Sequence, residues 1–544
     1  MATATAVHPP AAPAAARRRD RWLTPAACLA AALPAIVSTV RGIVDGYTAN
    51  GDRGVIAIRA YDVFSTHPPL TGQFSASSLV TGKTVHSPGP LLYWLLAPAA
   101  HIGGGETTLA LTMGLVNAAA LAGAVLLARR RGGVPLMLAA ALALALMCRS
   151  LPAETFHDIF NPAVGVIPLT LLFFVGWSVA CGDYRLLPLA VLVASFAAQA
   201  ELTFVLPSAA PLLVGVVGLV ACRRRLEGRV WPWVAGAVAV GLVCWAPPLV
   251  DELTHRNGNL SLIAQTATTD VPTVGTTLGW HAVVRAVGIP PWWLRIPTDP
   301  FYMLGDVQAA PGTFSIVTAV VVLLGLVGAT IAGVWRRRSD IASATALSLL
   351  LLVALLAVAA STPSRSILMS SLGYTLWWAA PAGMFAWLAL GFAATAVPRP
   401  SLGRAARYMP ATGAATAVAV GAAVAAAERP GQDRPEYGPL RTAIARVDAA
   451  VPARTGTVKV GGTGSWTSFD FQAGIAYQLR RRGLRPIATW AAKRTGLRYS
   501  IDHRYRVAVF AWNGRAPHPT DRVLARVPLA TANDGVVTVT YAAR

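Results

Sequence analysis

One stretch of the sequence, Gly51 to Pro98, concentrates side chains that exchange protons, in a chain of which only 13% of residues are charged. Carboxylates can serve as general bases, and histidine and lysine can bind an anionic group such as a phosphate. The stretch therefore predicts a site for acid–base chemistry on a phosphate-bearing substrate. The residues that carry this prediction are Asp52, Asp62, His67, Lys83 and His86.

Asp52 follows a glycine and precedes Arg53, just beyond the first apolar segment. Low-dielectric surroundings raise the proton affinity of a carboxylate, so an acid placed there is a candidate general base. The alternative is a solvated loop acid that pairs with Arg53. If residues 53–64 form a helix, the spacing of ten places Asp62 near the same face, beside the same pocket. Asp62 could instead cap the end of this helix.

Two histidines stand beside prolines, in STHPPL and VHSPGP. Proline restricts the backbone, so His67 and His86 are held at defined places and, with Lys83, are candidates to bind a phosphate. Either histidine could equally cap an interfacial helix. The two histidines together with Asp52 and Asp62 are a candidate set for a divalent cation, although their spacing matches no metal motif. No other cofactor is expected.

The elements that must position these residues are membrane helices. The chain has 544 residues, 55% of them hydrophobic, and a mean hydropathy of +0.53. Apolar runs of about 17–25 residues recur, the length that crosses a bilayer. The formal net charge is +22, but the arginines stand mostly at the ends of apolar segments, which is typical of membrane orientation and not of nucleic-acid binding. The fold class is therefore an α-helical polytopic protein of the plasma membrane, with the lipid bilayer and no nucleic acid as its partner.

Eleven apolar segments predict eleven transmembrane helices within a domain of residues 23–427, after a disordered cytoplasmic tail of residues 1–22. Arginine clusters lie on one side of the membrane if the N-terminus is cytoplasmic, as the excess of basic residues in cytoplasmic loops requires. Gly89–His101 is then an interfacial or re-entrant helix, because another crossing would move Arg129–Arg131 outside. The segments are 23–42, 107–128, 133–148, 163–181, 186–204, 205–222, 230–249, 313–335, 342–360, 371–396 and 409–427. The clusters are Arg17–Arg19, Arg129–Arg131, Arg185, Arg223–Arg225 with Arg229, Arg336–Arg338, and Arg399 with Arg404 and Arg407.

In this threading the loop 43–106 faces the outside and is the predicted active-site loop. Other polar groups face the same side. Arg149 and Arg365 are further candidate ligands of a donor phosphate. Polar side chains at the end of a span usually face a cavity, and the tryptophans of PPWWLR offer either stacking surfaces for a sugar or an interfacial belt. The candidate pocket residues are Glu154, His157, Asp158, Gln199, Glu201, Trp292 and Trp293.

Residues 428–544 differ from the rest, because apolar runs shorten and turn signals appear. GTVKVGG and YRVAVFAW predict strands, and PLRTAIARVDAAV and WTSFDFQAGIAYQLRRRG predict amphipathic helices. This region contains 19 lysines and arginines against eight acids, a net charge of +11. The C-terminal domain is therefore expected to be a small extracytoplasmic α/β domain suited to a partner with acidic groups.

The run GDRGVIAIRAYDVFS, followed by HPPLTG and VHSPGPLLYWLLAP, resembles the GT-C superfamily of membrane glycosyltransferases that use polyprenyl-phosphate sugars. It is most similar to actinobacterial members related to the protein O-mannosyltransferase and lipid A aminoarabinose transferase branch. DIFNPAVGVIPL and QAELTF also resemble stretches of that branch, although Glu201 stands where a histidine is common. The resemblance covers about the first 265 residues.

The resemblance implies an inverting transfer of a sugar from a polyprenyl-phosphate donor to a cell-envelope glycan, lipid or protein acceptor on the outer face. Asp52 occupies the acidic position of the branch and is implied to be the base, and His86 occupies the basic position. The Ala- and Arg-rich composition makes decaprenyl-phosphate arabinose and polyprenyl-phosphate mannose the leading donors, and the C-terminal domain is expected to position the acceptor glycan. A flippase or transporter of a lipid-linked sugar and a non-catalytic glycan-binding scaffold stay open as alternatives. A transporter is expected to show internal repeats and broken helices, which the sequence does not display.

Overall fold

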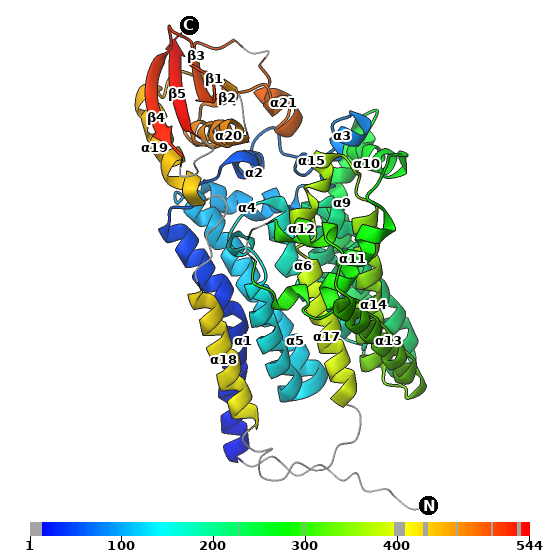
Figure 1. Ribbon diagram of the computed structural model, residues 1–544. Coiled ribbons are helices and arrows are strands. Elements are labelled where there is room, and N and C mark those ends of the chain that lie inside the picture. Colours follow the sequence, from blue (N-terminus) through cyan, green and yellow to red (C-terminus); the bar gives the residue numbers. More distant parts are fainter. Residues whose placement is uncertain are drawn as a thin grey trace, which may run out of the picture.

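A bundle of long helices carries a small sheet domain at one end (Figure 1). The computed structural model describes residues 14–226, 228–297, 299, 301–395, 409–427, 434–463, 466–501, 504–529 and 535–543. Within these residues, seven helices are long and apolar enough to cross a membrane, or eight if a pair bent by 42° at Ser366–Thr375 and Ala379–Thr395 is one span. The protein is therefore a multi-pass membrane protein with a C-terminal sheet domain.

The bundle holds a continuous apolar core in which small residues let the helices approach closely. A Cβ at Gly176 of α6 would lie 2.6 Å from the carbonyl oxygen of Pro211 on α8, and a Cβ at Gly218 would lie 2.5 Å from that of Ala180. The bundle helices are α1 (Ala14–Val44), α5 (Glu106–Arg149), α6 (Asn161–Ala180), α7 (Leu187–Ala200), α8 (Val205–Cys222), α9 (Trp231–Thr254), α13 (Thr313–Trp335), α14 (Ser339–Ala360), α17 (Ala379–Thr395) and α18 (Met409–Ala426).

Helix α5 is formally continuous over 44 residues but consists of two arms that run in opposite directions. The backbone is non-helical at Gly132–Gly133, and Gly133 has a φ of +67°, which glycine adopts readily. The first arm runs antiparallel to α1, where Arg129 bonds the Thr24 hydroxyl. The chain then returns, because the hydroxyl of Ser38, more than three turns farther along α1, donates to the carbonyl of Ala153 just after α5.

Each of the eleven predicted segments therefore contains a helix or one arm of α5, while the number of crossings stays a prediction. Residues 14–22 were expected to belong to a disordered tail, but they extend α1 toward the N-terminus. Alanine and arginine are strong helix formers, and they continue the helix that the apolar residues begin. Residues 1–13 lie outside the described residues.

Short elements connect the bundle helices. A helix is present within Gly89–His101 as α4, which packs against α2, α5 and α7 beneath the sheet domain (Figure 1), while its position at the membrane interface stays a prediction. The connecting elements are α2 (Gly51–Asp62), α3 (Ser78–Thr81), α4 (Leu91–His101), η1 (Ala153–Phe156), η2 (Tyr184–Leu186), η3 (Leu202–Phe204), η4 (Arg223–Arg225), α10 (Asn259–Thr268), α11 (Gly275–Val287), η5 (Trp292–Leu294), α12 (Tyr302–Gln308), α15 (Ser366–Met369) and α16 (Leu372–Thr375).

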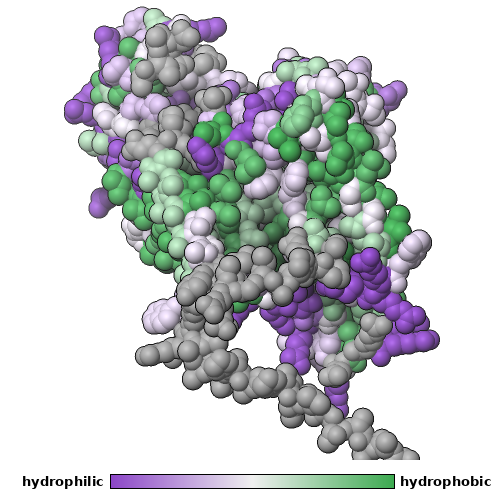
Figure 2. All heavy atoms as spheres, turned by 60° about the horizontal axis from the view of Figure 1, so that its bottom comes forward, coloured by the Kyte–Doolittle hydropathy of each residue, from purple (hydrophilic) through white to green (hydrophobic). Residues whose placement is uncertain are grey.

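The arginine clusters that the structure describes gather at the end of the bundle away from the sheet domain. Arg130 and Arg131 both pair with Asp183, at 3.2 and 2.6 Å. One cavity is lined by Arg130 and Arg185, and also by Leu226 and Ser339, which directly follow the clusters Arg223–Arg225 and Arg336–Arg338. Four of the predicted clusters therefore lie at or beside this cavity. Figure 2 shows hydrophilic residues at this end below a hydrophobic band. The clusters at Arg17–Arg19 and Arg399–Arg407 fall on side chains outside the described part.

The C-terminal domain is a five-stranded mixed sheet in the order β2-β1-β3-β5-β4. Strand β1 runs parallel to β2 and β3, and β5 runs antiparallel to β3 and β4. Both predicted strands and both predicted helices are present. The elements are α19 (Arg434–Ala450), β1 (Thr457–Thr463), α20 (Trp466–Arg481), β2 (Arg485–Ile487), α21 (Ala491–Arg494), η7 (Leu497–Tyr499), β3 (Val507–Asn513), β4 (Arg522–Pro528) and β5 (Val536–Ala543).

Helix α20 packs one face on the sheet and the other on α2, so α2 lies between the bundle and the C-terminal domain (Figure 1). The approach is close, because a Cβ at Gly54 would lie 2.7 Å from the carbonyl carbon of Ala473. Ile56, Leu92, Phe471 and other residues of α2, α4 and the C-terminal domain share one hydrophobic core. This core therefore holds α2 in a fixed orientation between the bundle and the C-terminal domain.

Candidate active site

Asp52 lies in the first turn of α2, where the chain turns sharply out of the loop after α1. Gly51 has a φ of +46°, in the left-handed region that favours glycine. The N-terminal end of a helix carries a partial positive charge, which favours an ionised carboxylate in the first turn. The turn therefore presents Asp52 at the junction between the bundle and the C-terminal domain.

One oxygen of Asp52 is held and the other is open. Oδ1 accepts a hydrogen bond from Gln73 Nε2 at 3.0 Å and pairs with the Arg494 guanidinium of α21. Within the described residues, no donor reaches Oδ2, and the side chain keeps 31% of its exposure. An ionised carboxylate with one oxygen fixed and one accessible is suited to accept a proton from a bound hydroxyl.

Arg59 and Tyr93 are further polar side chains in this region, beside the Arg494 guanidinium that contacts Asp52. Arg59 lies seven residues beyond Asp52, about two helical turns, and so shares its face of α2. Its Nη1 donates to the carbonyl of Thr495 at 2.7 Å. The Tyr93 hydroxyl of α4 donates to Gln73 Oε1 at 3.3 Å and so orients the amide that contacts Asp52. The neighbourhood of Asp52 is therefore positively charged, which suits an anionic substrate group.

Two more carboxyl groups lie close to Asp52. Glu201, between α7 and η3, accepts a hydrogen bond from Asn161 Nδ2 at 2.6 Å. Asp470 of α20 lies against Gly51, since a Cβ there would be 2.1 Å from Asp470 Oδ1. Glu201 and Asp470 thus add two carboxyl groups to the surroundings of Asp52.

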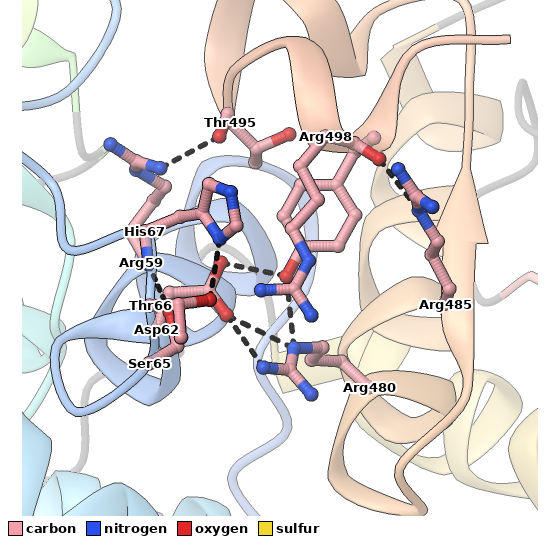
Figure 3. A network of polar contacts seen from close by, with 10 residues as sticks. Arg59, Asp62, Ser65, Thr66, His67, Arg480, Arg485, Thr495 and Arg498 are labelled. Atoms are coloured by element: carbon pink, nitrogen blue, oxygen red, sulfur yellow. Dashed lines mark hydrogen bonds and ion pairs between the residues drawn. The ribbon is translucent and has the colours of Figure 1, made fainter. Parts of the chain in front are cut away.

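Asp62 serves a different purpose from the one predicted. Its carboxylate is 1% exposed and accepts hydrogen bonds from Arg480 Nε at 3.0 Å, Arg480 Nη2 at 2.8 Å and the Tyr499 hydroxyl at 2.6 Å (Figure 3). Ten helical residues rotate the side chain by about 80° relative to Asp52, so the two acids do not share a pocket. Asp62 anchors the C-terminal domain to α2, and the interpretation as a second catalytic carboxylate loses its support.

Asp158 is likewise an internal anchor, at the start of the bundle. It is fully buried and pairs with Arg53 at 2.7 Å, while the Tyr47 hydroxyl donates to it at 2.8 Å. Glu154 and His157 are also buried, and with Tyr437 they line a small cavity between α1, α18 and α19. Asp158 therefore holds the loop after α1 in place, while Glu154 and His157 line this separate cavity.

The candidate phosphate ligands are dispersed. His86 Nε2 donates to the Lys493 carbonyl at 2.9 Å, and burial lowers its pKa to about 4, so it is uncharged at neutral pH. Lys83 Nζ bonds Gln265 at 2.9 Å, Arg365 bonds the Leu79 carbonyl at 2.6 Å, and His67 is exposed beside Thr66. Arg149 ends α5 and is half-buried. None of these contacts joins the residues to Asp52.

Three predicted pocket residues are structural. Gln199 is 1% exposed and links α7 to α9 and α4, through the Cys244 carbonyl at 2.8 Å and the Leu91 amide at 3.3 Å. Trp292 is fully buried and donates to Asp306 at 2.8 Å, and Trp293 packs against the bundle core. The short turn η5 directs these rings inward, so they do not form a stacking surface for a sugar.

No metal cluster is found among the described residues, where no group of three or more His, Cys, Asp or Glu side chains is placed so that it could hold a metal ion. Asp52, Asp62, His67 and His86 instead have separate partners. The residues that sequence reasoning missed are Gln73, Arg59, Asp470 and Arg494. Only Arg59 carried a usable signal, its seven-residue spacing from Asp52, because the others come from distant parts of the chain.

Comparisons with known proteins add one likeness. No protein-family model matches the chain, and no curated protein matches it. Among solved structures, the chain is similar to the crystal structure of ArnT from Cupriavidus metallidurans in the apo state, with 15% sequence identity and a TM-score of 0.47 over 93% of this chain and 97% of that chain. A likeness of this degree concerns the course of the chain and decides nothing about activity.

Proposed function

We propose that this protein is a GT-C-type glycosyltransferase that moves a sugar from a polyprenyl-phosphate donor to a cell-envelope glycan, lipid or protein. The observation that carries the proposal is Asp52, a half-buried carboxylate with one accessible oxygen at one end of a membrane bundle, which pairs with Arg494 and shares its face of α2 with Arg59. This combination fits a reaction that needs a base for a hydroxyl and cations for a lipid-linked phosphate. Asp52 also lies within the run Gly51–Pro98, whose sequence resembles GT-C glycosyltransferases.

In the proposed reaction, Asp52 Oδ2 removes the proton from an acceptor hydroxyl as its oxygen attacks the anomeric carbon. The bond from that carbon to the phosphate oxygen breaks, its electron pair stays on the polyprenyl phosphate, and the anomeric configuration inverts. Asp52 thereby becomes a carboxylic acid and later returns its proton to water. No nucleotide takes part, so the reaction is compatible with the outer face of the membrane.

The donor phosphate would be held by Arg59 and Arg494 in this proposal, in place of the dispersed histidine and lysine candidates. A carboxylate paired with a guanidinium is a weak base, because the pair stabilises its ionised form. Transfer of Arg494 from Asp52 to the incoming phosphate would release the base when the donor is present. The contact of Arg494 with Asp52 is then the donor-free arrangement.

The outer-face location rests on the charge distribution. The arginine clusters at the far end of the bundle support a cytoplasmic side there, and Asp52 and the C-terminal domain would then lie outside. We include polyprenyl-phosphate mannose and decaprenyl-phosphate arabinose as the donors to be examined first, on composition alone.

The experiment is a transfer assay with purified full-length protein in nanodiscs, radiolabelled donors of both kinds and a crude cell-wall acceptor fraction. Transfer from at least one donor is expected. Arg494→Gln removes a charge-assisted contact of about 1.5–3 kcal/mol, so the KM for the donor should rise about 10- to 100-fold. Arg522→Gln, an exposed arginine of β4, is the matched control. Absence of transfer from every lipid-linked donor would contradict the proposal.

A further inference from the structure

Aromatic side chains of the C-terminal domain continue outward from Asp52 in an unbroken series. The Arg494 guanidinium, which pairs with Asp52, lies 4.6 Å from the centroid of the Phe469 ring. Phe469 contacts Trp490 edge to face at 5.5 Å and Trp466 at 6.5 Å. The two steps from Arg494 place the Trp466 ring within about 11 Å of the guanidinium.

Trp466 is 66% exposed at the start of α20, which is unusual for a side chain whose burial contributes so much to stability. The other strongly exposed tryptophans of the described chain stand near the arginine-rich ends of candidate spans, at Trp22, Trp231, Trp233 and Trp335. An interfacial belt explains that group. It does not explain Trp466, because the sheet domain stands beyond the opposite end of the bundle (Figure 1).

Polar groups accompany the rings. Trp490 Nε1 donates to Gln472 Oε1 at 3.1 Å, so its orientation is fixed by a buried amide. Asp470, one residue from Phe469, presents its carboxylate at the Gly51 turn. A rigid aromatic surface that ends at carboxylates has the two features that a saccharide needs, a face for its apolar C–H groups and acceptors for its hydroxyls.

We infer that Trp466, Phe469 and Trp490 form the binding surface for a saccharide acceptor, with the reactive hydroxyl directed past Asp470 to Asp52. This inference rests on the proposed function, because it assigns the acceptor of that reaction. Asp470 orients the acceptor by accepting from a neighbouring hydroxyl and leaves the proton transfer to Asp52. The surface lies on the C-terminal domain and the base on α2, so docking of the two domains completes the site.

The test measures saccharide binding without transfer, by saturation-transfer NMR on donor-free full-length protein in nanodiscs. The probes are neutral manno- and arabino-oligosaccharides. The wild-type protein is expected to bind at least one of them, and Trp466→Ala to weaken that binding about tenfold, which corresponds to about 1.4 kcal/mol. Trp466→Phe keeps a ring and should restore most of the affinity. Trp231→Ala, which removes an exposed tryptophan at the far end, is the matched control and should bind as the wild type does.

Three results would overturn the inference: no oligosaccharide binding by the wild type, unchanged binding by Trp466→Ala, or equal weakening by Trp231→Ala. Unchanged binding would indicate that Trp466 is an ordinary surface residue, and equal weakening would indicate an effect that is not specific to this surface. Failure of the proposed function looks different, because transfer would be absent from every donor while the Trp466-dependent binding persisted. Transfer that proceeds with an acceptor KM unaffected by Trp466→Ala would reject the inference and keep the proposed function.

Discussion

Removal of Arg480 is predicted to loosen the contact between α2 and the C-terminal domain. Arg480→Leu leaves the Asp62 carboxylate, 1% exposed, with the Tyr499 hydroxyl at 2.6 Å as its remaining partner in Figure 3. Loss of one member of a buried ion pair costs about 3–5 kcal/mol, because the other charge stays buried. The Arg480 side chain is itself only 12% exposed, so solvent does little to reduce this cost.

The double variant separates an uncompensated charge from a lost contact. Asp62→Leu with Arg480→Leu removes both charges and should cost no more than about 1–3 kcal/mol, the penalty for leaving the Tyr499 hydroxyl without its acceptor. Hydrogen exchange of α2 and α20 amides is the appropriate assay, because it reports local opening in a protein that need not unfold in one step.

Arg480→Leu should accelerate exchange in α20 by roughly 10²–10⁴-fold, and the double variant by less. Arg446→Leu, at an exposed position of α19, serves as the matched control and should not change it. Equal effects of the single and double variants would refute the reasoning, because the buried charge would then contribute nothing. Unchanged exchange in Arg480→Leu would show that the ion pair does not hold the domain.

Two further predictions concern the surroundings of Asp52. Because burial lowers the pKa of His86 to about 4, the contribution of its neutral side chain to folding stability is present above about pH 6.5 and is lost as pH falls toward 4. Thermal unfolding of His86→Gln should therefore show a weaker destabilisation by acid, and its KM for the donor should stay within about twofold of the wild-type value. Gly51→Ala should slow transfer and destabilise the α2 junction by more than about 1–2 kcal/mol, because the φ of +46° disfavours a side chain and the new Cβ would collide with Asp470. Gly82→Ala is the control for the backbone effect alone, because Gly82 has a φ of +71° and a Cβ there would meet no atom within 4 Å.

The course of the bundle could be predicted from the sequence because its signals are local. Apolar runs give the helices, the glycine pair and Pro135 after Arg129–Arg131 give the reversal in α5, and the short run before His101 gives α4. The strands at Thr457–Thr463 and Val507–Asn513 follow from β-branched and aromatic residues between turn signals. Each of these features depends on neighbours along the chain.

The site could be predicted only in part, because side-chain roles depend on contacts between distant segments. Asp52 was predicted from its place at the end of an apolar segment, but its partner Arg494 lies 442 residues away. Asp62 carries the same local signal as Asp52 and is instead a buried anchor, since Arg480 and Tyr499 cover it. Histidine is a basic residue, but burial lowers the pKa of His86 to about 4, so its side chain is uncharged at neutral pH.

The most direct test of the central claim is single-turnover transfer by Asp52→Asn with a donor that the wild type uses. The amide keeps the shape and the Gln73 contact but cannot accept the proton, so the rate should fall about 10²–10⁴-fold. Donor affinity should persist, and Asp270→Asn, an exposed acid, should transfer at the wild-type rate. Transfer by Asp52→Asn at the wild-type rate, with the donor bound equally well, would contradict the assignment of Asp52 as the base.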